Sequence, residues 1–250
     1  MKNHARLLVA AGIAASAVSA QAALTVLDSE AFANKYNGDQ IFDGATTVND
    51  WVAAGGSGSE PTFALNGANV VTTINNTNGW VQHDNGSTPW EQGSGSWTVE
   101  VRAKVSATGT GGFVIWGALN GERDIMTIRE NQVSNLSGGS VFHTGSNTDG
   151  FHNFRMAYDA ADDVYHYFRD GVQITPAAGI GQQAGTGSTR LIIGDCCTSA
   201  GGGILGGVGS SVEYAYVRYD NSGAFAPVPE PSTLALFGLA GLGLIFRRRR

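Results

Sequence analysis

The segment Trp97–Val105 constrains the fold of this chain more than any other part of the sequence. Its odd-numbered positions are all apolar, and Thr98, Glu100, Arg102 and Lys104 stand between them. This period of two predicts a β-strand with one face in a core and the other in water. Glycine supplies 36 of the 250 residues and charged residues only 14%, which argues against a coiled coil or a helical bundle and favours an all-β chain with many turns.

Seven other segments predict further strands, and Asp170-Gly171 between two of them is a strong hairpin signal. These segments are Phe113–Trp116, Ile125–Arg129, Phe151–Tyr158, Val164–Arg169, Val172–Ile174, Leu191–Ile193 and Val212–Tyr219. Short strands with frequent turns and no long helical period predict an antiparallel β-sandwich. The region Leu24–Gly79 is less regular, and Ser29–Tyr36 in it predicts a short helix.

The N-terminal residues 1–22 are predicted to be a targeting segment. They begin with Lys2 and Arg6, continue through an apolar run and end in the small-x-small site Ala20-Gln21-Ala22. This layout is typical of a secretory signal peptide, formed as a helix and removed on export. A buried N-terminal helix is the alternative.

The C-terminal end is predicted to enter a membrane. The apolar run Leu234–Phe246 is followed by four arginines. Thirteen helical residues span about 20 Å, short of a hydrocarbon core of about 30 Å. Snorkelling arginines and the two residues before the run extend the predicted transmembrane helix to 232–246, and the arginines favour the cytoplasmic side.

The body between these ends is acidic. Nine of the 15 Lys and Arg residues and 20 of the 21 Asp and Glu residues lie in 23–228, so this part carries a net charge near −11. The cations are scattered singly, whereas nucleic acid binding needs clustered cations. The sequence therefore excludes nucleic acid as a partner.

The tail at 227–250 resembles a PEP-CTERM sorting signal. Pro229, Glu230 and Pro231 form the Pro-Glu-Pro motif, and the apolar run and arginine cluster follow. The resemblance implies export in a Gram-negative bacterium that makes extracellular polysaccharide, and an integral-membrane exosortase as partner. It also implies a protein tethered to the inner membrane and then placed at the cell surface or in the extracellular matrix. A plain C-terminal anchor with a proline-rich hinge is the alternative.

The body, predicted as residues 23–226, is similar to concanavalin A-like jelly rolls, and to laminin-G-like (LamG-like) and glucanase-like domains in particular. An aromatic-His-x-Phe-Arg start at Phe151 leads to Tyr158-Asp159, a short turn, and the sequence Tyr-Phe-Arg-Asp-Gly-Val that ends at Val172. A Leu-x-Ile-Gly strand follows at Leu191. The resemblance spans about Trp80–Asp220 and implies the fold. It implies no single function, because this fold hosts lectins, glycosidases and adhesion modules alike.

The catalytic candidates are Glu122 and Asp124, which resemble the E-x-D-x-x-E strand of family-16 β-glucanases. The resemblance makes Glu122 the nucleophile, but the acid/base position falls on Thr127, or on Met126 in the shorter pattern, and neither has a carboxyl group. A retaining glycosidase needs two carboxyl groups about 5–5.5 Å apart. We therefore expect no enzyme activity, with a hydrolase using Glu122 and Asp124 as the alternative. A hairpin turn with solvated charges explains the same residues without a site.

The ligand-binding candidates are Trp90, His83 and Asp84. Trp90 lies in a Gly/Ser/Pro-rich loop, where a flat ring can stack on a sugar, and His83 and Asp84 supply hydrogen-bonding groups. The alternative is that Trp90, like Trp51, Trp80 and Trp116, fills the core.

Cys196 and Cys197 are the only cysteines and are adjacent. In an exported chain they should oxidise, and a vicinal disulfide, intermolecular bridging and a free pair all remain open. No metal site is predicted from the histidine spacing. Calcium, the one cofactor that stays open, would use the acidic turn Asp159–Asp163 or Asp195, and a solvated turn is the alternative.

Together these features predict an exported, non-catalytic β-sandwich that contacts extracellular polysaccharide. A β-glucan hydrolase and a purely structural adhesion protein are the two alternatives. The first predicts a carboxyl pair in an open groove, and the second predicts no retention of any saccharide.

Overall fold

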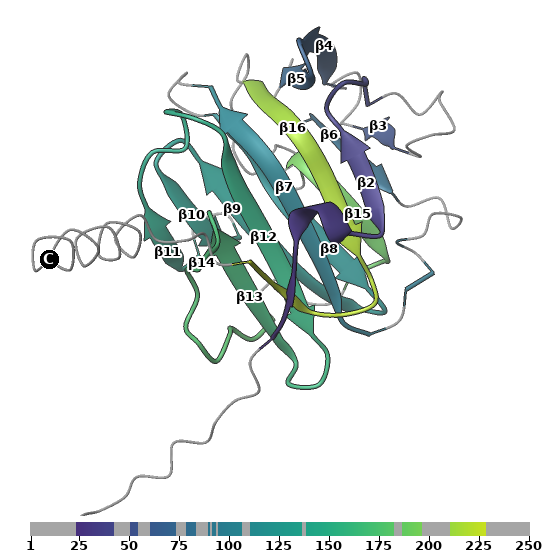
Figure 1. The fold of residues 1–250 in the computed structure, drawn as a ribbon, viewed down its shortest axis with the longest axis vertical. Coiled ribbons are helices and arrows are strands. Elements are labelled where there is room, and N and C mark those ends of the chain that lie inside the picture. Colours follow the sequence, from purple (N-terminus) through teal and green to yellow (C-terminus); the bar gives the residue numbers. More distant parts are fainter. Residues whose placement is uncertain are drawn as a thin grey trace, which may run out of the picture.

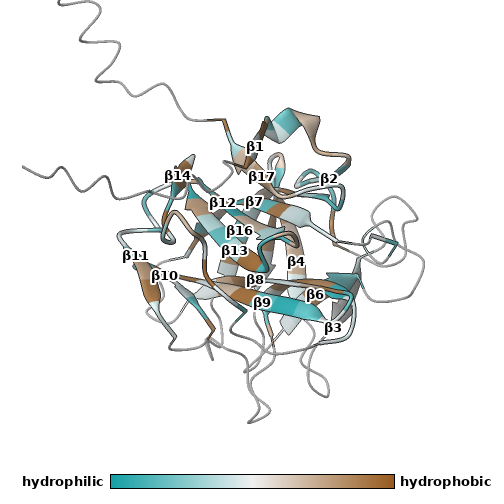
Figure 2. Ribbon diagram, turned by 90° about the horizontal axis from the view of Figure 1, so that it is seen from below, coloured by the Kyte–Doolittle hydropathy of each residue, from teal (hydrophilic) through white to brown (hydrophobic). Residues whose placement is uncertain are grey.

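The computed structural model describes residues 24–42, 51–54, 61–73, 79–83, 90, 92–93, 95–106, 111–136, 139–182, 187–196 and 211–228. These residues form a β-sandwich of two large sheets, with a small third sheet laid on the outside of one of them (Figures 1 and 2). The predicted all-β antiparallel sandwich is therefore confirmed for the body.

The first sheet has seven strands. In spatial order they are β11 (Val141–Thr144), β10 (Gln132–Asn135), β9 (Glu122–Arg129), β8 (Gly112–Leu119), β15 (Arg190–Asp195), β6 (Gly79–His83) and β3 (Val52–Ala54). All neighbours are antiparallel.

The second sheet has eight strands. The order is β14 (Val172–Gln173), β13 (Val164–Arg169), β12 (His152–Asp159), β7 (Trp97–Val105), β16 (Ser211–Asp220), β5 (Asn69–Thr73) and β4 (Thr62–Asn66), and β2 (Asn34–Asn37) also pairs with β16. The predicted strand Trp97–Val105 is β7 with the same bounds, and it lies at the centre of this sheet.

Two hairpin turns follow the chemistry of their residues. Asp170 and Gly171 have φ angles of 49° and 79°, and Asn120 and Gly121 have φ angles of 54° and 91°. Two successive positive φ values define the turn whose twist matches a β-hairpin, and Asn-Gly and Asp-Gly adopt it most readily. Both signals in the sequence therefore mark true hairpins, between β13 and β14 and between β8 and β9.

The core lies between the two large sheets and is rich in aromatic rings. Trp97 at the start of β7 is fully buried there. Its ring lies against the backbone of Gly117 on β8, so closely that a Cβ atom on Gly117 would fall inside the ring's van der Waals surface. Glycine at this position therefore makes room for tryptophan on the opposite sheet.

Substitution of Gly117 by alanine should destabilise the body by about 1–3 kcal/mol, because the added methyl group overpacks the core against Trp97. Gly150 is a matched control, since a Cβ atom there meets nothing within 4 Å. Urea unfolding of the G117A and G150A variants measures both effects. A G117A midpoint equal to that of G150A would contradict the close packing.

The outer face of β7, which the sequence predicts to lie in water, is only partly exposed. Arg102 and Lys104 on the outer side of β7 are partly exposed, but Thr98 and Glu100 are buried. The covering segment is a third sheet in which β1 (Thr25–Leu27) and β17 (Phe225–Pro227) pair in parallel. We call this two-stranded sheet the clasp; Figure 2 shows it over the outer side of the eight-stranded sheet.

The clasp joins segments from the two ends of the body. Thr98 Oγ1 donates to the carbonyl of Gly223 and accepts from the amide of Phe225. The helix predicted over Ser29–Tyr36 is wrong: a single 3-10 turn covers Ser29–Ala31, and β2 begins at Asn34. Strand pairing of β2 with β16 replaces the rest of that helix.

The predicted signal helix in 1–22 and the predicted transmembrane helix at 232–246 lie outside the described residues. Within the described ranges, no helix is long and apolar enough to cross a membrane.

Candidate functional site

The two catalytic candidates lie on the same face of β9, as the period of two predicts, but that face is the interior one. Asp124 is fully buried and pairs in register with Gly117, on the side of the sheet that also carries Met126 and Ile128 of the main core. Glu122 pairs with Leu119 at the rim of this core. Asp124 therefore does not line an open groove.

Asp124 is held by a tyrosine from the opposite sheet. The hydroxyl of Tyr167 on β13 donates a hydrogen bond of 2.7 Å to Oδ2 of Asp124, and both residues are buried. Burial, together with the carboxylate of Asp124, raises the pKa of Tyr167 well above its usual value. Burial is also the main cause that raises the pKa of Tyr165, with the charge of Asp124 next. The carboxylate of Asp124 and the phenol of Tyr167 thus form a structural bridge between the sheets.

The buried tyrosines predict a loss of stability in alkaline solution. Burial raises the pKa of Tyr167 and of Tyr214 well above 10. The folded protein therefore keeps these protons while the unfolded chain releases them near pH 10, so their contribution is complete below pH 10 and falls as the pH rises further. The slope is about 1.4 kcal/mol per pH unit for each such tyrosine.

Urea unfolding between pH 9 and pH 12, followed by phenolate absorbance and circular dichroism, tests this expectation. Most of the phenolate signal should appear together with unfolding. Ionisation of all seven tyrosines near pH 10 in a chain that stays folded would contradict it.

The structure places Trp90 and His83, two of the predicted ligand-binding residues, in the interior. Trp90 is fully buried, its indole N–H donates to the carbonyl of Ala118 at 3.1 Å, and its ring packs edge-on against Trp97. His83 points inward from β6, with its ring centroid 3.9 Å from that of Trp51. Asp84 lies outside the described residues.

Cys196 follows β15, is fully buried and is bonded through a disulfide. Cys197 lies outside the described residues, so the vicinal pairing stays a prediction.

Two carboxylates of the acidic turn are engaged within the protein. Asp159 Oδ1 accepts from the amide of Ala161, and Asp163 accepts from the hydroxyl of Tyr158. Across the described residues, no group of three or more His, Cys, Asp and Glu side chains could hold a metal ion.

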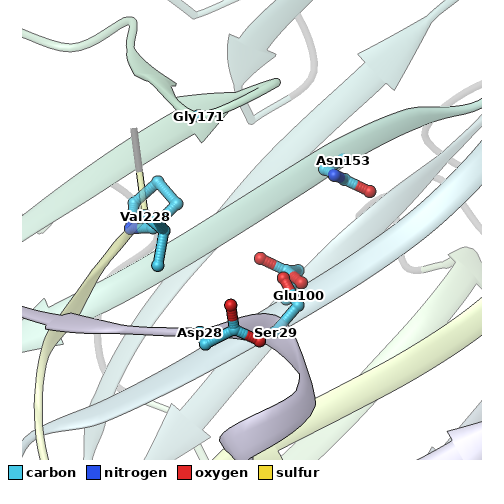
Figure 3. A pocket seen from close by; sticks show the side chains of 7 residues that line it. Asp28, Ser29, Glu100, Asn153, Gly171 and Val228 are labelled. Atoms are coloured by element: carbon cyan, nitrogen blue, oxygen red, sulfur yellow. The ribbon is translucent and has the colours of Figure 1, made fainter. Parts of the chain in front are cut away.

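A pocket of about 230 Å³ lies where the clasp meets the eight-stranded sheet (Figure 3). Asp28, Glu100 and Asn153 contribute polar groups to its wall, and Val228 stands at its edge. The tail continues directly from Val228, so this pocket adjoins the root of the predicted sorting signal.

Glu100, which lines this pocket, belongs to a buried ion pair that fastens the clasp. The guanidinium of Arg155 on β12 lies 2.6–2.7 Å from Oε2 of Glu100, and both side chains are almost fully buried. The same guanidinium donates to the carbonyl of Leu27 on β1 at 3.0 Å. Tyr216 donates to the other oxygen of Glu100 at 2.9 Å. These bonds give the carboxylate of Glu100 a structural role.

The outer face of the seven-stranded sheet lies on the far side of the molecule from the clasp (Figure 2). It carries a second apolar cluster of buried residues, among them Trp116, Ala118 and Ile192, and Trp80 packs against this cluster. Trp80 is half-buried there, and its indole N–H donates to Oε1 of Gln82 at 2.7 Å. The guanidinium of Arg123 stacks over the ring of Trp116 at 5.0 Å. We call Trp80, Gln82, Trp116 and Arg123, together with Arg190, the outer-face cluster.

The two arginines of this cluster were not predicted from the sequence to be functional. Arg123 lies between the two catalytic candidates, and Arg190 opens a predicted strand, but 67 positions separate them. Each occupies a position of its strand that alternates with core residues, which is the one signal that could have marked them as outward-facing.

Comparison with known proteins identifies the tail and the fold. The family model of the PEP-CTERM protein-sorting motif matches residues 227–250. No curated protein matches the sequence.

Among solved structures, the chain is similar to a single-substitution mutant of the Emp46p carbohydrate recognition domain, with a TM-score of 0.50 and 12% identity over 76% of this chain and 96% of that one. It also aligns with a carbohydrate esterase from the Shiga toxin-encoding bacteriophage phi24B, with a TM-score of 0.48 and 13% identity over 74% and 95%. A native glycosidic hydrolase aligns with a TM-score of 0.46 and 15% identity over 76% and 96%.

At such identities a structural likeness shows the fold alone. The chain is thus an exported protein with a PEP-CTERM sorting motif at 227–250, behind a jelly-roll-like β-sandwich whose structural neighbours have carbohydrate-binding and glycosidase-like folds.

Proposed function

We propose that this protein is a non-catalytic surface or matrix module that contacts extracellular polysaccharide through the outer-face cluster. Trp80 is the observation that carries this proposal. A half-buried indole ring beside the amide of Gln82 offers an apolar face and a hydrogen-bonding group side by side, and sugars present apolar ring faces and hydroxyl groups in the same way.

The burial of Asp124 disfavours the hydrolase alternative. A glycosidase needs both carboxyl groups at the scissile bond, and Tyr167 occupies the one carboxyl group that could assist Glu122. Nothing in the geometry of β9 favours the hydrolase. We therefore expect the E122Q variant and the unaltered chain to release the same amount of sugar from a β-glucan.

An exosortase is the proposed processing partner, and the tail root explains how it gains access. Val228 follows β17 and is exposed, and proline disfavours a helix in the motif that comes next in the sequence. The proposed route is tethering in the inner membrane followed by placement at the cell surface or in the extracellular matrix.

Affinity electrophoresis through gels that contain purified extracellular polysaccharides tests the proposed contact. Trp80→Ala should reduce retention at least fivefold, because it removes the ring that is proposed to contact the sugar. Phe151→Ala is the matched control, since Phe151 is also half-buried and lies below Arg102 on the other sheet.

Two results would contradict the proposal. Equal retention of the W80A and F151A variants would remove Trp80 as the contact. No retention of the unaltered chain by any polysaccharide would favour the purely structural adhesion role.

A further inference from the structure

A histidine at the start of β12 lies between two aspartates. Nδ1 of His152 is 2.7 Å from Oδ2 of Asp170, in the turn between β13 and β14, and Nε2 is 3.0 Å from Oδ1 of Asp149, in the segment before β12. An ionised carboxylate only accepts hydrogen bonds, and a neutral imidazole has a single N–H group. Both contacts are therefore hydrogen bonds at the same time only when the ring is an imidazolium with a proton on each nitrogen.

The other charged groups around this ring are few. Arg169 lies 3.0 Å from the same oxygen of Asp170. His143 on β11 approaches from the other sheet; burial lowers its pKa most, and the charges of Arg169 and His152 lower it further while that of Asp170 raises it. The neighbours of His152 within its own sheet are apolar, because the ring of Phe154 packs edge-on against it and the residue opposite it on β7 is an alanine.

The two aspartates are held unequally. Asp170 is the more enclosed, with its side chain 31% exposed, and its Oδ1 accepts from the amide of Asn153 at 2.9 Å. The side chain of Asp149 is 66% exposed. Hydrogen bonds from His152 and then from Ser146 lower the pKa of Asp149, so this carboxyl group stays ionised in mild acid. A ring with one proton should therefore keep the bond to Asp170, since water can hydrate Asp149.

We propose that His152 is a pH-sensitive latch that ties the segment before β12 to the β13–β14 turn. The latch is closed when the imidazolium bonds both aspartates. It opens when Nε2 gives its proton to water, because the lone pair left on Nε2 then faces the carboxylate of Asp149, and neither group has a proton to share. Histidine is the side chain that changes its charge between pH 5 and 8, so the latch closes in mildly acidic surroundings and opens in mildly alkaline ones.

The movement on opening should be small, because the residues on either side of the released segment have other bonds. Asn147 is fully buried, its side-chain amide donates to the carbonyl of Arg129 at 2.6 Å, and its backbone amide donates to the carbonyl of Glu130 at 2.7 Å. At the other end, β12 pairs in register with β7 from its first residue. Opening of the latch should therefore be confined to Asp149 and Gly150.

Nuclear magnetic resonance of the full-length protein, labelled with 15N and kept in detergent, tests the proposal. Long-range proton–nitrogen spectra show which ring nitrogens of His152 carry a proton. Both should be protonated at about pH 5, and only Nδ1 should be protonated at about pH 8. The backbone amide signal of Gly150 should shift along the same titration, whereas the signals of Asn147 should stay where they are.

Two variants separate the latch from other titrating groups. D149N keeps the size of the side chain and removes its charge, so the Gly150 signal should lose its dependence on the His152 titration. H143Q is the matched control, because it removes the second histidine at this end of the sandwich and none of the latch contacts. It should leave the protonation pattern of the His152 ring and the Gly150 shift unchanged.

Three results would overturn the proposal. The same set of protonated ring nitrogens at both pH values would show that His152 does not switch. A neutral ring with its proton on Nε2 would show that Asp149 keeps its bond, so that the segment is not released. A Gly150 titration that persists in D149N or vanishes in H143Q would assign the change to a group other than the latch.

Discussion

Replacement of Trp90 by alanine should lower the free energy of unfolding by about 3–5 kcal/mol, the cost of removing a large buried aromatic side chain. The ring packs edge-on against Trp97 and Tyr219, with centroids 5.2 and 5.6 Å away. The substitution also removes the indole that donates to the carbonyl of Ala118. Since a domain of this size is stable by about 5–15 kcal/mol, the variant should be marginal.

Urea unfolding of W90A and W80A side by side measures the effect. Both substitutions remove one tryptophan, but Trp80 is half-buried on the outer face, so W80A should lose much less stability than W90A. If the two variants unfold at the same urea concentration, Trp90 does not belong to the core. The same pair links stability to function, since only W80A should lose polysaccharide while it remains folded.

Removal of one partner from the buried pair of Glu100 and Arg155 should cost about 3–5 kcal/mol, because the other charge stays buried without compensation. Glu100 lines the pocket beside the clasp, and Arg155 also donates to the carbonyl of Leu27. E100A and R155A should therefore loosen β1 and β17 in addition to lowering the unfolding midpoint. Hydrogen exchange at Val26 and Ala226 would report the loosening.

A double variant tests whether the loss of stability comes from a buried charge that has lost its partner. Replacement of both residues by methionine removes the two charges together and should restore most of the loss, because apolar pairs of similar volume often match a buried ion pair. The exposed pair of Lys35 and Glu30, 3.8 Å apart, is a control whose removal should cost less than about 1 kcal/mol. A loss from E100A as small as that from K35A would contradict the buried pair.

Several strands and both hairpins could be predicted from local sequence. The alternation in Trp97–Val105 and the dipeptides Asn120-Gly121 and Asp170-Gly171 each act within a few residues, so no knowledge of the rest of the chain is needed. The sorting motif is also local, since its prolines, apolar run and arginines are contiguous. These features were predicted, and the structure or the family match bears them out.

The strands near the N-terminus could not be predicted in the same way. β1 has only three residues, and it exists because β17, 200 positions later, lies beside it. Its presence buries Thr98 and Glu100, so a solvent-facing half of β7 became an interior surface. Alternation reveals that a strand has two faces, but it cannot say what a distant segment lays over either of them.

The sequence by itself determined the fold class, the two hairpins and the sorting tail, because each depends on interactions between neighbours in the chain. Only the tertiary structure decided which side of each strand faces the core. A sandwich strand buries one face between the sheets whatever its polarity, so Asp124 on β9 became a core residue. The same packing brought Arg123 and Arg190 together across Ala118, since strand pairing joins residues that the sequence keeps 67 positions apart.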